Sequence, residues 1–205
     1  MIEAFSLRTA HHFGDALASQ AALRHRVFVE QRTLDHLSYD GLEYDEFDTP
    51  AAVYLVWRDT KNIVRGMVRL LPTTLPYMMQ SYWPELVEGE ELPQDARTWE
   101  ITRVCVDRMF EPRQRVRILP ELLCAAQEWF EANGVTTMIG VTRKHLLNHF
   151  IRRGVTWLGS EAMVEGEMEA AFRVPVSMIR PDLHCAKFEI TGSRLRIASD
   201  DRLAA

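Results

Sequence analysis

The sequence is poor in the features that mark secreted, membrane-spanning and nucleic-acid-binding proteins. Its 205 residues include three cysteines, which form no CxxC pair, so neither a disulfide framework nor a cysteine zinc site is indicated. No uninterrupted apolar stretch reaches the roughly 18 residues of a membrane-spanning helix, and the N-terminus lacks the basic and apolar regions of a signal peptide. The 24 Lys+Arg against 29 Asp+Glu give a formal net charge of −5, which disfavours a general nucleic-acid binder. We therefore expect a cytoplasmic protein that binds neither a membrane nor nucleic acid.

A metal-binding pattern is also missing from the sequence. The seven histidines form no HExxH motif. His145 and His149 lie four residues apart on a predicted helix, but no carboxylate companion stands near them in the pattern. Surface or packing roles are favoured for this pair, and no metal site is predicted.

The chain reads as one domain, residues 1–205, because it contains no repeat, low-complexity tract or Gly/Ser linker, and 47% hydrophobic residues can build a sizeable core. Helices are predicted from Asp15, as N-cap, to about Glu30, at about 118–132 with Pro120 in the first turn, and at 143–154. Strands are predicted at 52–58, 62–71, 97–107, 135–142, 155–159 and 168–176. Residues 31–50 form a long polar connection. This order predicts a mixed α/β fold, a three-layer sandwich with helices on both faces of one central sheet.

Three carboxylates stand close together in YDEFD (44–48), just before the apolar run AAVYLVW (51–57). Such a stretch is either a solvated turn in front of a strand or a site for a cationic ligand. Asp45 and Asp48 are the candidates for a site, whereas Glu46 between them is expected to point into solvent.

Four further charged residues interrupt apolar segments: Arg24 on the first helix, Arg69 on the second strand, and Glu100 and Arg103 on the third. Charged groups at such positions need partners. Taken singly, each favours a structural ion pair; together they predict one network. Strict alternation places Glu100 and Arg103 on opposite faces of their strand, so a joint site requires a β-bulge or a splayed sheet there.

The stretches LRHRVFVEQR (23–32), GLEYDEFDTPAAVYLVW (41–57), GMVRLLPTTLPYMM (66–79) and WEITRVCVD (99–107) resemble, in order and spacing, the acyl-homoserine lactone synthases of the autoinducer family. The resemblance implies an N-acetyltransferase-like fold and an enzyme that makes a quorum-sensing signal. In this sequence Leu34 stands where the family usually has a tryptophan. The charged and aromatic signature of the family falls on Arg24, Phe28, Asp45, Asp48, Arg69, Glu100 and Arg103.

The resemblance also implies the reaction. An acyl group, carried as a thioester on acyl carrier protein or coenzyme A, is joined to the amine of S-adenosylmethionine, which is a substrate rather than a cofactor. Asp45 and Asp48 would oppose its positive groups, and Arg24, Arg69 or Arg103 would hold its carboxylate or orient the aspartates. Glu100 is the candidate general base for the amine.

The same resemblance suggests an acyl pocket and a docking face for the acyl carrier. Pocket candidates are Met78, Met79, Trp83, Leu123, Trp129, Met138, Val141 and Thr142, although such side chains more often serve as core. The docking candidates are Arg143, Lys144, Arg152 and Arg153, with Arg113, Arg115 and Arg117 as further cations. A solvated helix surface explains these charges equally well.

Two alternatives stay open at this point. An ordinary acyl-coenzyme A N-acyltransferase would hold pyrophosphate with a glycine-rich loop, but the corresponding stretch VDRMFEPRQRVRILPELL (106–123) contains no glycine. A non-catalytic binding module on the same fold would use Asp45, Asp48 and Glu100 as ion-pair partners alone.

Overall fold

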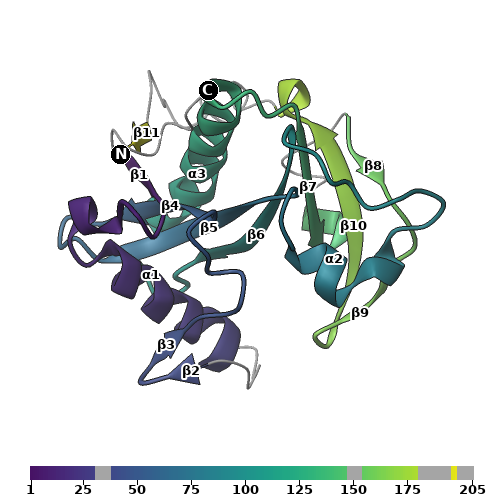
Figure 1. The fold of residues 1–205 in the computed structure, drawn as a ribbon. Helices are drawn as coiled ribbons and strands as arrows, with labels where there is room; N and C mark the ends of the chain where they lie inside the picture. The colour runs from purple at the N-terminus through teal and green to yellow at the C-terminus, as the bar shows by residue number, and fades with distance from the viewer. Residues whose placement is uncertain (31–37, 147–153, 180–194, 198–205) are drawn as a thin grey trace. The chain divides into compact units, whose positions relative to one another are not determined.

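The computed structural model describes residues 1–30, 38–146, 154–179 and 195–197. Its strands are β1 (Ile2–Phe5), β2 (Ser38–Tyr39), β3 (Leu42–Glu43), β4 (Val53–Arg58), β5 (Val64–Pro72), β6 (Thr98–Val106), β7 (Thr137–Thr142), β8 (Thr156–Trp157), β9 (Ala162–Val164), β10 (Glu167–Pro175) and β11 (Leu195–Ile197) (Figure 1). Its α-helices are α1 (Ala16–Arg24), α2 (Met78–Tyr82) and α3 (Pro112–Ala132). Short 3-10 turns are η1 (Ala10–Phe13), η3 (Pro84–Leu86) and η4 (Val176–Met178), and η2 (His25–Glu30) is a π-helix.

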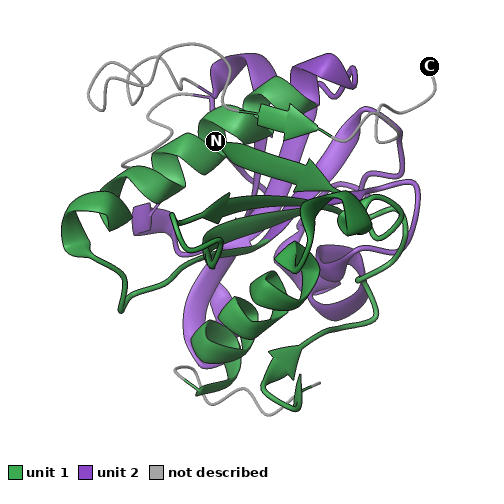
Figure 2. Ribbon diagram, turned by 90° about the vertical axis from the view of Figure 1, so that its left-hand side faces the viewer, with its two compact units in different colours: residues 1–69, 103–129, 181–205 green, residues 70–102, 130–180 purple. Residues whose placement is uncertain are grey.

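The chain divides into two compact units, coloured separately in Figure 2. Unit 1 consists of residues 1–69, 103–129 and 181–205, and unit 2 consists of residues 70–102 and 130–180. Strands β5 and β6 and helix α3 each contribute residues to both units. The assignment of residues 1–205 to one domain stays a prediction.

Unit 1 contains helices on both faces of a mixed sheet. Its strands follow the order β11-β1-β4-β5, with β1 parallel to β11 and antiparallel to β4. Gly66 of β5 faces α3 so closely that a Cβ there would lie 2.2 Å from Cγ2 of Ile118. Arg69, three residues further and so on the opposite face, shares Asp48 with Arg24 of α1. Helices α1 and α3 therefore cover opposite faces of β5.

Unit 2 is built on three longer strands. β7 is parallel to β6 over Thr98–Glu100 and antiparallel to β10. β10 in turn pairs with β8 and with β9. The predicted strands at 52–58, 62–71, 97–107, 135–142 and 168–176 are thus confirmed as β4, β5, β6, β7 and β10, and 155–159 contains β8.

The first predicted helix has the right extent, but its second part is a π-helix rather than an α-helix. α1 ends at Arg24, and the chain continues to Glu30 as the π-helix η2. Asp15 is the N-cap residue of α1, as predicted, but its carboxylate accepts a hydrogen bond from Arg58 and does not cap the N–H groups of the helix.

The helix predicted from about 118 starts earlier, at Pro112, so Pro120 lies inside α3 rather than in its first turn. The sequence contains the reason for the earlier start. Proline is favoured at the first helical position. Glu111, just before it, accepts hydrogen bonds from the backbone N–H groups of Arg113 (3.0 Å) and Gln114 (2.9 Å). The end of α3 is as predicted, with Gly134 in the left-handed region at φ 68°.

The long connection predicted at 31–50 contains a hairpin. Ser38 pairs with Glu43 and Tyr39 with Leu42 around Asp40-Gly41. Both turn residues have positive φ, the geometry of a two-residue hairpin turn for which Asp-Gly is a strong signal. Residues 31–37, including Leu34, lie outside the described residues, as do 147–153 of the helix predicted at 143–154.

No helix in the described part of the chain is long and apolar enough to cross a membrane.

Candidate functional site

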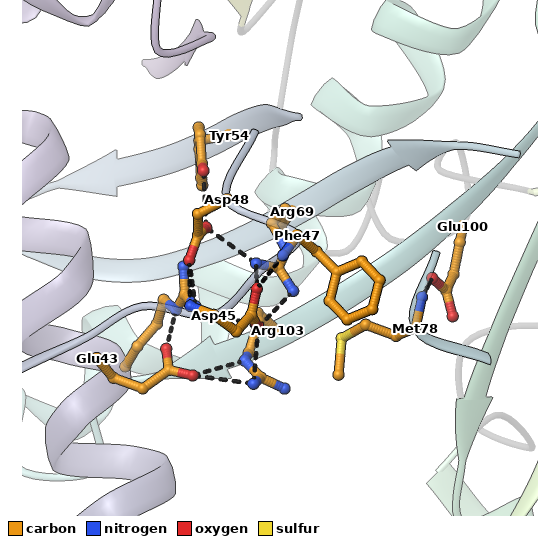
Figure 3. A network of polar contacts seen from close by, with 10 residues as sticks. Glu43, Asp45, Phe47, Asp48, Tyr54, Arg69, Met78, Glu100 and Arg103 are labelled. Carbon is orange, nitrogen blue, oxygen red and sulfur yellow. Dashed lines mark hydrogen bonds and ion pairs between the residues drawn. The ribbon is translucent and has the colours of Figure 1, made fainter. Parts of the chain in front are cut away.

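Six charged side chains gather in unit 1, from segments far apart in the sequence (Figure 3). α1, β3, β5 and β6 contribute one residue each, and the loop between β3 and β4 contributes two. Arg24 and Arg69 are fully buried, at 0% exposure. We call this set the ion-pair network; it consists of Arg24, Glu43, Asp45, Asp48, Arg69 and Arg103.

The carboxylate of Asp48 forms a bidentate ion pair with the guanidinium of Arg24. Nη1 of Arg24 donates to Oδ1 at 2.7 Å, and Nη2 donates to Oδ2 at 2.9 Å. Oδ1 also accepts from Nη1 of Arg69 at 2.9 Å and from the hydroxyl of Tyr54 at 2.7 Å. Paired parallel bonds of this kind fix direction as well as distance.

Asp45 makes the equivalent pair with Arg69. Nη1 of Arg69 donates to Oδ1 at 2.6 Å, and Nη2 donates to Oδ2 at 2.8 Å. Nη2 of Arg103 lies 2.9 Å from Oδ2 of the same carboxylate. The backbone N–H of Asp45 donates to Asp48 at 2.8 Å, which explains the three-residue spacing of the two aspartates in YDEFD.

Glu43 connects Arg24 to Arg103 within the ion-pair network, and no feature of the sequence marked it as a candidate. Its Oε2 accepts from Nε of Arg24, and its Oε1 accepts from Nε (3.1 Å) and Nη2 (2.9 Å) of Arg103. The side chain is 1% exposed. The signal that could have found it is the hairpin, because a β-strand at 42–43 turns the side chain of Glu43 to the opposite face from that of Leu42.

The arginines keep the two aspartates ionised. Burial alone would raise the pKa of Asp48, but the hydrogen bond from Arg24 and the charges of Arg69 and Arg24 hold it well below its usual range. For Asp45, burial is likewise outweighed by Arg69 and Arg103, so its pKa is lowered. Burial and the charge of Asp48 raise the pKa of Tyr54, which stays a neutral donor.

Three arginines and three carboxylates leave this network with no net formal charge. Asp45 and Asp48 therefore have arginines as their partners in the described structure, an arrangement that the solvated-turn interpretation does not predict. Their contact with S-adenosylmethionine stays a prediction.

Glu100 belongs to unit 2, where it holds the first turn of α2. Its Oε2 accepts from the backbone N–H of Met78 and its Oε1 from that of Met79, each at 2.9 Å, and the residue is 1% exposed (Figure 3). Backbone donors of this kind favour the ionised carboxylate.

Arg103 departs from regular strand geometry. Its φ is 50°, in the left-handed region, which costs a residue other than glycine about 1–3 kcal/mol. Thr102 and Arg103 are both buried, whereas Val104 is 41% exposed, so strict alternation is broken at this point of β6. Regular strand geometry is thus interrupted at Arg103, and a joint role of Glu100 and Arg103 stays a prediction. The guanidinium of Arg103 also lies over the ring of Phe28, 5.2 Å from its centroid.

The acyl-pocket candidates are mostly buried. Met78, Met79 and Met138 in unit 2 are at most 2% exposed, and Trp83, Leu123 and Thr142 are half-buried. A cavity of about 210 Å³ in unit 2 has Glu90, Asp95, Thr98, Ile139 and Arg173 among its lining residues and none of these candidates. The acyl pocket stays a prediction.

Two of the predicted docking cations already have acidic partners. Arg143 lies 2.6 Å from Glu167, and Lys144 lies 3.8 Å from Glu161. Arg152 and Arg153 lie outside the described residues.

Among the described residues, no group of three or more His, Cys, Asp or Glu side chains is arranged to hold a metal ion. His149 is not among them.

The fold and the comparisons identify the class of protein. An acyl-coenzyme A N-acyltransferase from Pseudomonas aeruginosa superposes with a TM-score of 0.51 at 18% identity, over 77% of this chain and 89% of that one, which places the fold with the N-acetyltransferases. A sequence profile of the autoinducer synthase family matches residues 10–178. The chain therefore belongs to the autoinducer synthase family, and the predicted activity, acyl transfer that forms an acyl-homoserine lactone, is confirmed. The two alternatives are set aside.

Several members of this family are similar over most of their length. The isovaleryl-homoserine lactone synthase of Bradyrhizobium diazoefficiens is 34% identical over 86% of this chain and 80% of its own. An acyl-homoserine-lactone synthase of Pseudomonas aeruginosa is 31% identical over 78% of this chain and 79% of its own. The solved structure of BjaI with MTA, a coenzyme A-dependent acyl-homoserine lactone synthase, has a TM-score of 0.84 at 30% identity, over 97% of this chain and 93% of that one.

The lowered pKa values of Asp45 and Asp48 predict acid sensitivity. As pH falls, the unfolded chain takes up protons on these residues near the ordinary aspartate pKa of about 3.9, before the folded chain does. Stability is therefore fully present above about pH 5 and lost progressively as the pH drops below about 4. Urea unfolding followed by circular dichroism between pH 7 and pH 3 measures this loss.

The control is Glu46→Gln, which removes an exposed carboxylate from the same stretch and should leave the acid profile unchanged. A free energy of unfolding that stays constant from pH 5 to pH 3 contradicts the prediction.

Proposed function

We propose that the chain transfers an acyl group from an acyl thioester to the amine of S-adenosylmethionine and then closes the methionine part into a lactone, releasing methylthioadenosine. The observation that carries the proposal is the family match over residues 10–178, which spans every residue of the ion-pair network. BjaI, 30% identical, has been solved with S-adenosylmethionine and isopentyl-coenzyme A together.

In this proposal the ion-pair network acts as a frame. Each aspartate already accepts bonds from two arginines, so its main task is to orient them rather than to meet the sulfonium directly. Arg103, whose guanidinium lies over the ring of Phe28, would contact the substrate. It would bind the substrate carboxylate, for which a guanidinium is well suited.

The chemistry needs one deprotonation. The α-ammonium of S-adenosylmethionine must lose a proton before its nitrogen can attack the thioester carbonyl, and we assign Glu100 to accept it, directly or through a water. The carbon–nitrogen bond then forms, and the thiolate of the carrier leaves. Backbone N–H groups at the irregular point of β6 would stabilise the intermediate oxyanion.

Ring closure follows without further acid–base help. A carboxylate oxygen of the methionine part attacks the carbon next to the sulfonium, the carbon–sulfur bond breaks, and methylthioadenosine leaves as a neutral molecule.

We further propose acyl-coenzyme A as the preferred donor. Arg143 and Lys144, which would have attracted an acidic carrier protein, are already paired with Glu167 and Glu161. BjaI is coenzyme A-dependent. Because Glu111 occupies the first N–H groups of α3, the phosphates of coenzyme A would be held by arginine side chains instead, such as the exposed Arg113.

We place the reaction in the cytoplasm, as the sequence predicts. The free, buried thiols of Cys105 and Cys124 support a reducing compartment.

Replacing Glu100 by Gln tests the base. Loss of the carboxylate should lower kcat by about 100-fold or more near neutral pH. The variant should regain activity as the pH rises toward 9, because a free α-amine has a pKa of about 8 and then deprotonates unaided. Release of methylthioadenosine, measured as a pH–rate profile for both proteins, reports the difference.

Thermal unfolding by circular dichroism checks that the Gln variant, which can keep one of the two bonds to α2, is still folded. Parallel pH–rate profiles for variant and wild type would remove Glu100 from the role of base and leave it as the anchor of α2.

The donor is tested with matched acyl groups on coenzyme A and on acyl carrier protein. Incubation with S-adenosylmethionine and mass spectrometry of the lactones should give a kcat/KM at least about tenfold higher for the coenzyme A thioesters, since Arg143 and Lys144 already have acidic partners. A higher value on acyl carrier protein would overturn the donor assignment alone, whereas no lactone from either carrier would overturn the proposed function.

A further inference from the structure

Glu43 contacts the guanidinium of Arg103 directly within unit 1. Oε1 of Glu43 accepts two of the bonds of the Arg103 guanidinium, from Nε at 3.1 Å and from Nη2 at 2.9 Å. Oε2 is held in place from the other side by Nε of Arg24, which is fully buried. Glu43 is thus fixed between two arginines and cannot follow Arg103 if the strand changes shape.

Arg103 needs such a fixed partner, because its backbone is in a conformation that its side chain disfavours. Glycine adopts a φ of 50° without steric cost, whereas arginine is strained at this angle. A strained residue keeps such a conformation when its surroundings over-determine it. Around Arg103 these surroundings are the Glu43 carboxylate, Asp45 at 2.9 Å and the ring of Phe28.

The conformation of Arg103 has a consequence for the strand. Because alternation breaks there, Thr102 and Arg103 are both buried, and Val104 turns out to 41% exposure. The backbone N–H and C=O groups of these residues consequently point in directions that a regular strand does not offer.

We infer that Glu43 is a positioning residue for acyl transfer: by anchoring the Arg103 guanidinium, it holds Arg103 in the left-handed conformation and so sets the direction of the β6 backbone at the reaction site. This inference rests on the proposed function for its catalytic consequence, but its structural part concerns the conformation of residue 103 alone.

The first test replaces Glu43 by Gln, which keeps the size and removes the charge. We expect kcat for methylthioadenosine release to fall about tenfold or more at saturating substrate, since displacement of a reacting group by about 1 Å has effects of this order or larger. Glu46→Gln, at an exposed position three residues beyond the hairpin in the loop between β3 and β4, is the matched control and should stay within about twofold of wild type.

The second test separates the effect of the backbone conformation at residue 103 from the effect of its side chain. Both Arg103→Gly and Arg103→Ala remove the guanidinium, but glycine accepts a φ of 50° and alanine does not. We expect Arg103→Gly to keep at least about fivefold more kcat than Arg103→Ala. In the Arg103→Gly background, Glu43→Gln should cause a clearly smaller further loss, because Glu43 then holds the guanidinium of Arg24 and no longer acts on residue 103.

Equal kcat for the Gly and Ala variants, or an undiminished effect of Glu43→Gln in the Gly background, would overturn the inference. Where Arg103→Gly does not fold, as judged by circular dichroism, the comparison of Glu43→Gln with Glu46→Gln decides: a kcat within twofold of wild type for Glu43→Gln rejects it.

A measurement of the backbone conformation of residue 103, which does not depend on enzyme activity, tests the inference separately from the proposed function. In solution NMR, the ¹³C chemical shifts and the three-bond H–N–Cα–H coupling of residue 103 report its φ. They should show a left-handed residue in the wild type and an extended one in Glu43→Gln. An inactive wild type would end the proposed function, while unchanged NMR parameters in Glu43→Gln would end the inference about Glu43.

Discussion

Arg24 and Arg69 are completely buried, and each can remain charged inside the protein only because carboxylates pair with it. An isolated buried guanidinium is among the most costly groups a fold can contain. Its partners come from positions 19 to 24 residues away in the chain, so the ion pairs also tie α1 and β5 to the hairpin and the loop that follows it. Much of the local arrangement of unit 1 depends on this mutual neutralisation.

The same constraint shapes the chemistry. A network without net charge does not attract a cationic substrate by itself; instead it holds arginine side chains in fixed directions at low mobility. Buried ion pairs add little to stability compared with apolar packing, and their best-supported use is to select one arrangement among several. Here the selected arrangement includes the strained Arg103, whose position on β6 links the frame to the strand that also carries Glu100.

The sequence predicted the long strands and most of the charged site correctly, for different physical reasons. The strands β4, β5 and β7 consist mostly of apolar residues, with β-branched residues prominent in β7, and follow from local pattern. Arg24, Arg69 and Arg103 were found because charges inside apolar segments demand partners. Asp45 and Asp48 were found because YDEFD places three carboxylates close together in front of a strand. Which charge meets which could not be derived, because pairing depends on tertiary contacts across up to 60 residues.

The points at which the sequence predictions failed have three separate physical causes. Glu43 was missed and the hairpin at 38–43 was read as loop because the strands are two residues long, too short for any periodicity to show. The conflict between alternation and a joint role of Glu100 and Arg103 arose because sequence pattern assumes ordinary φ values, and a left-handed arginine breaks that assumption. The start of α3 was placed late because Pro120 was taken as a boundary, although the capping by Glu111 and Pro112 was readable.

The claim that the ion-pair network acts as one mutually dependent unit is tested most directly by a double-mutant cycle on one of its buried pairs, Arg69 and Asp45. The free energy of unfolding is measured by urea denaturation for Arg69→Met, Asp45→Asn and the combined variant. Each single change should destabilise the protein by about 3–5 kcal/mol, since it leaves a buried charge without its partner, and the combined variant should lose clearly less than the sum. Strictly additive losses, or single changes of about 0.5 kcal/mol or less, would contradict the account.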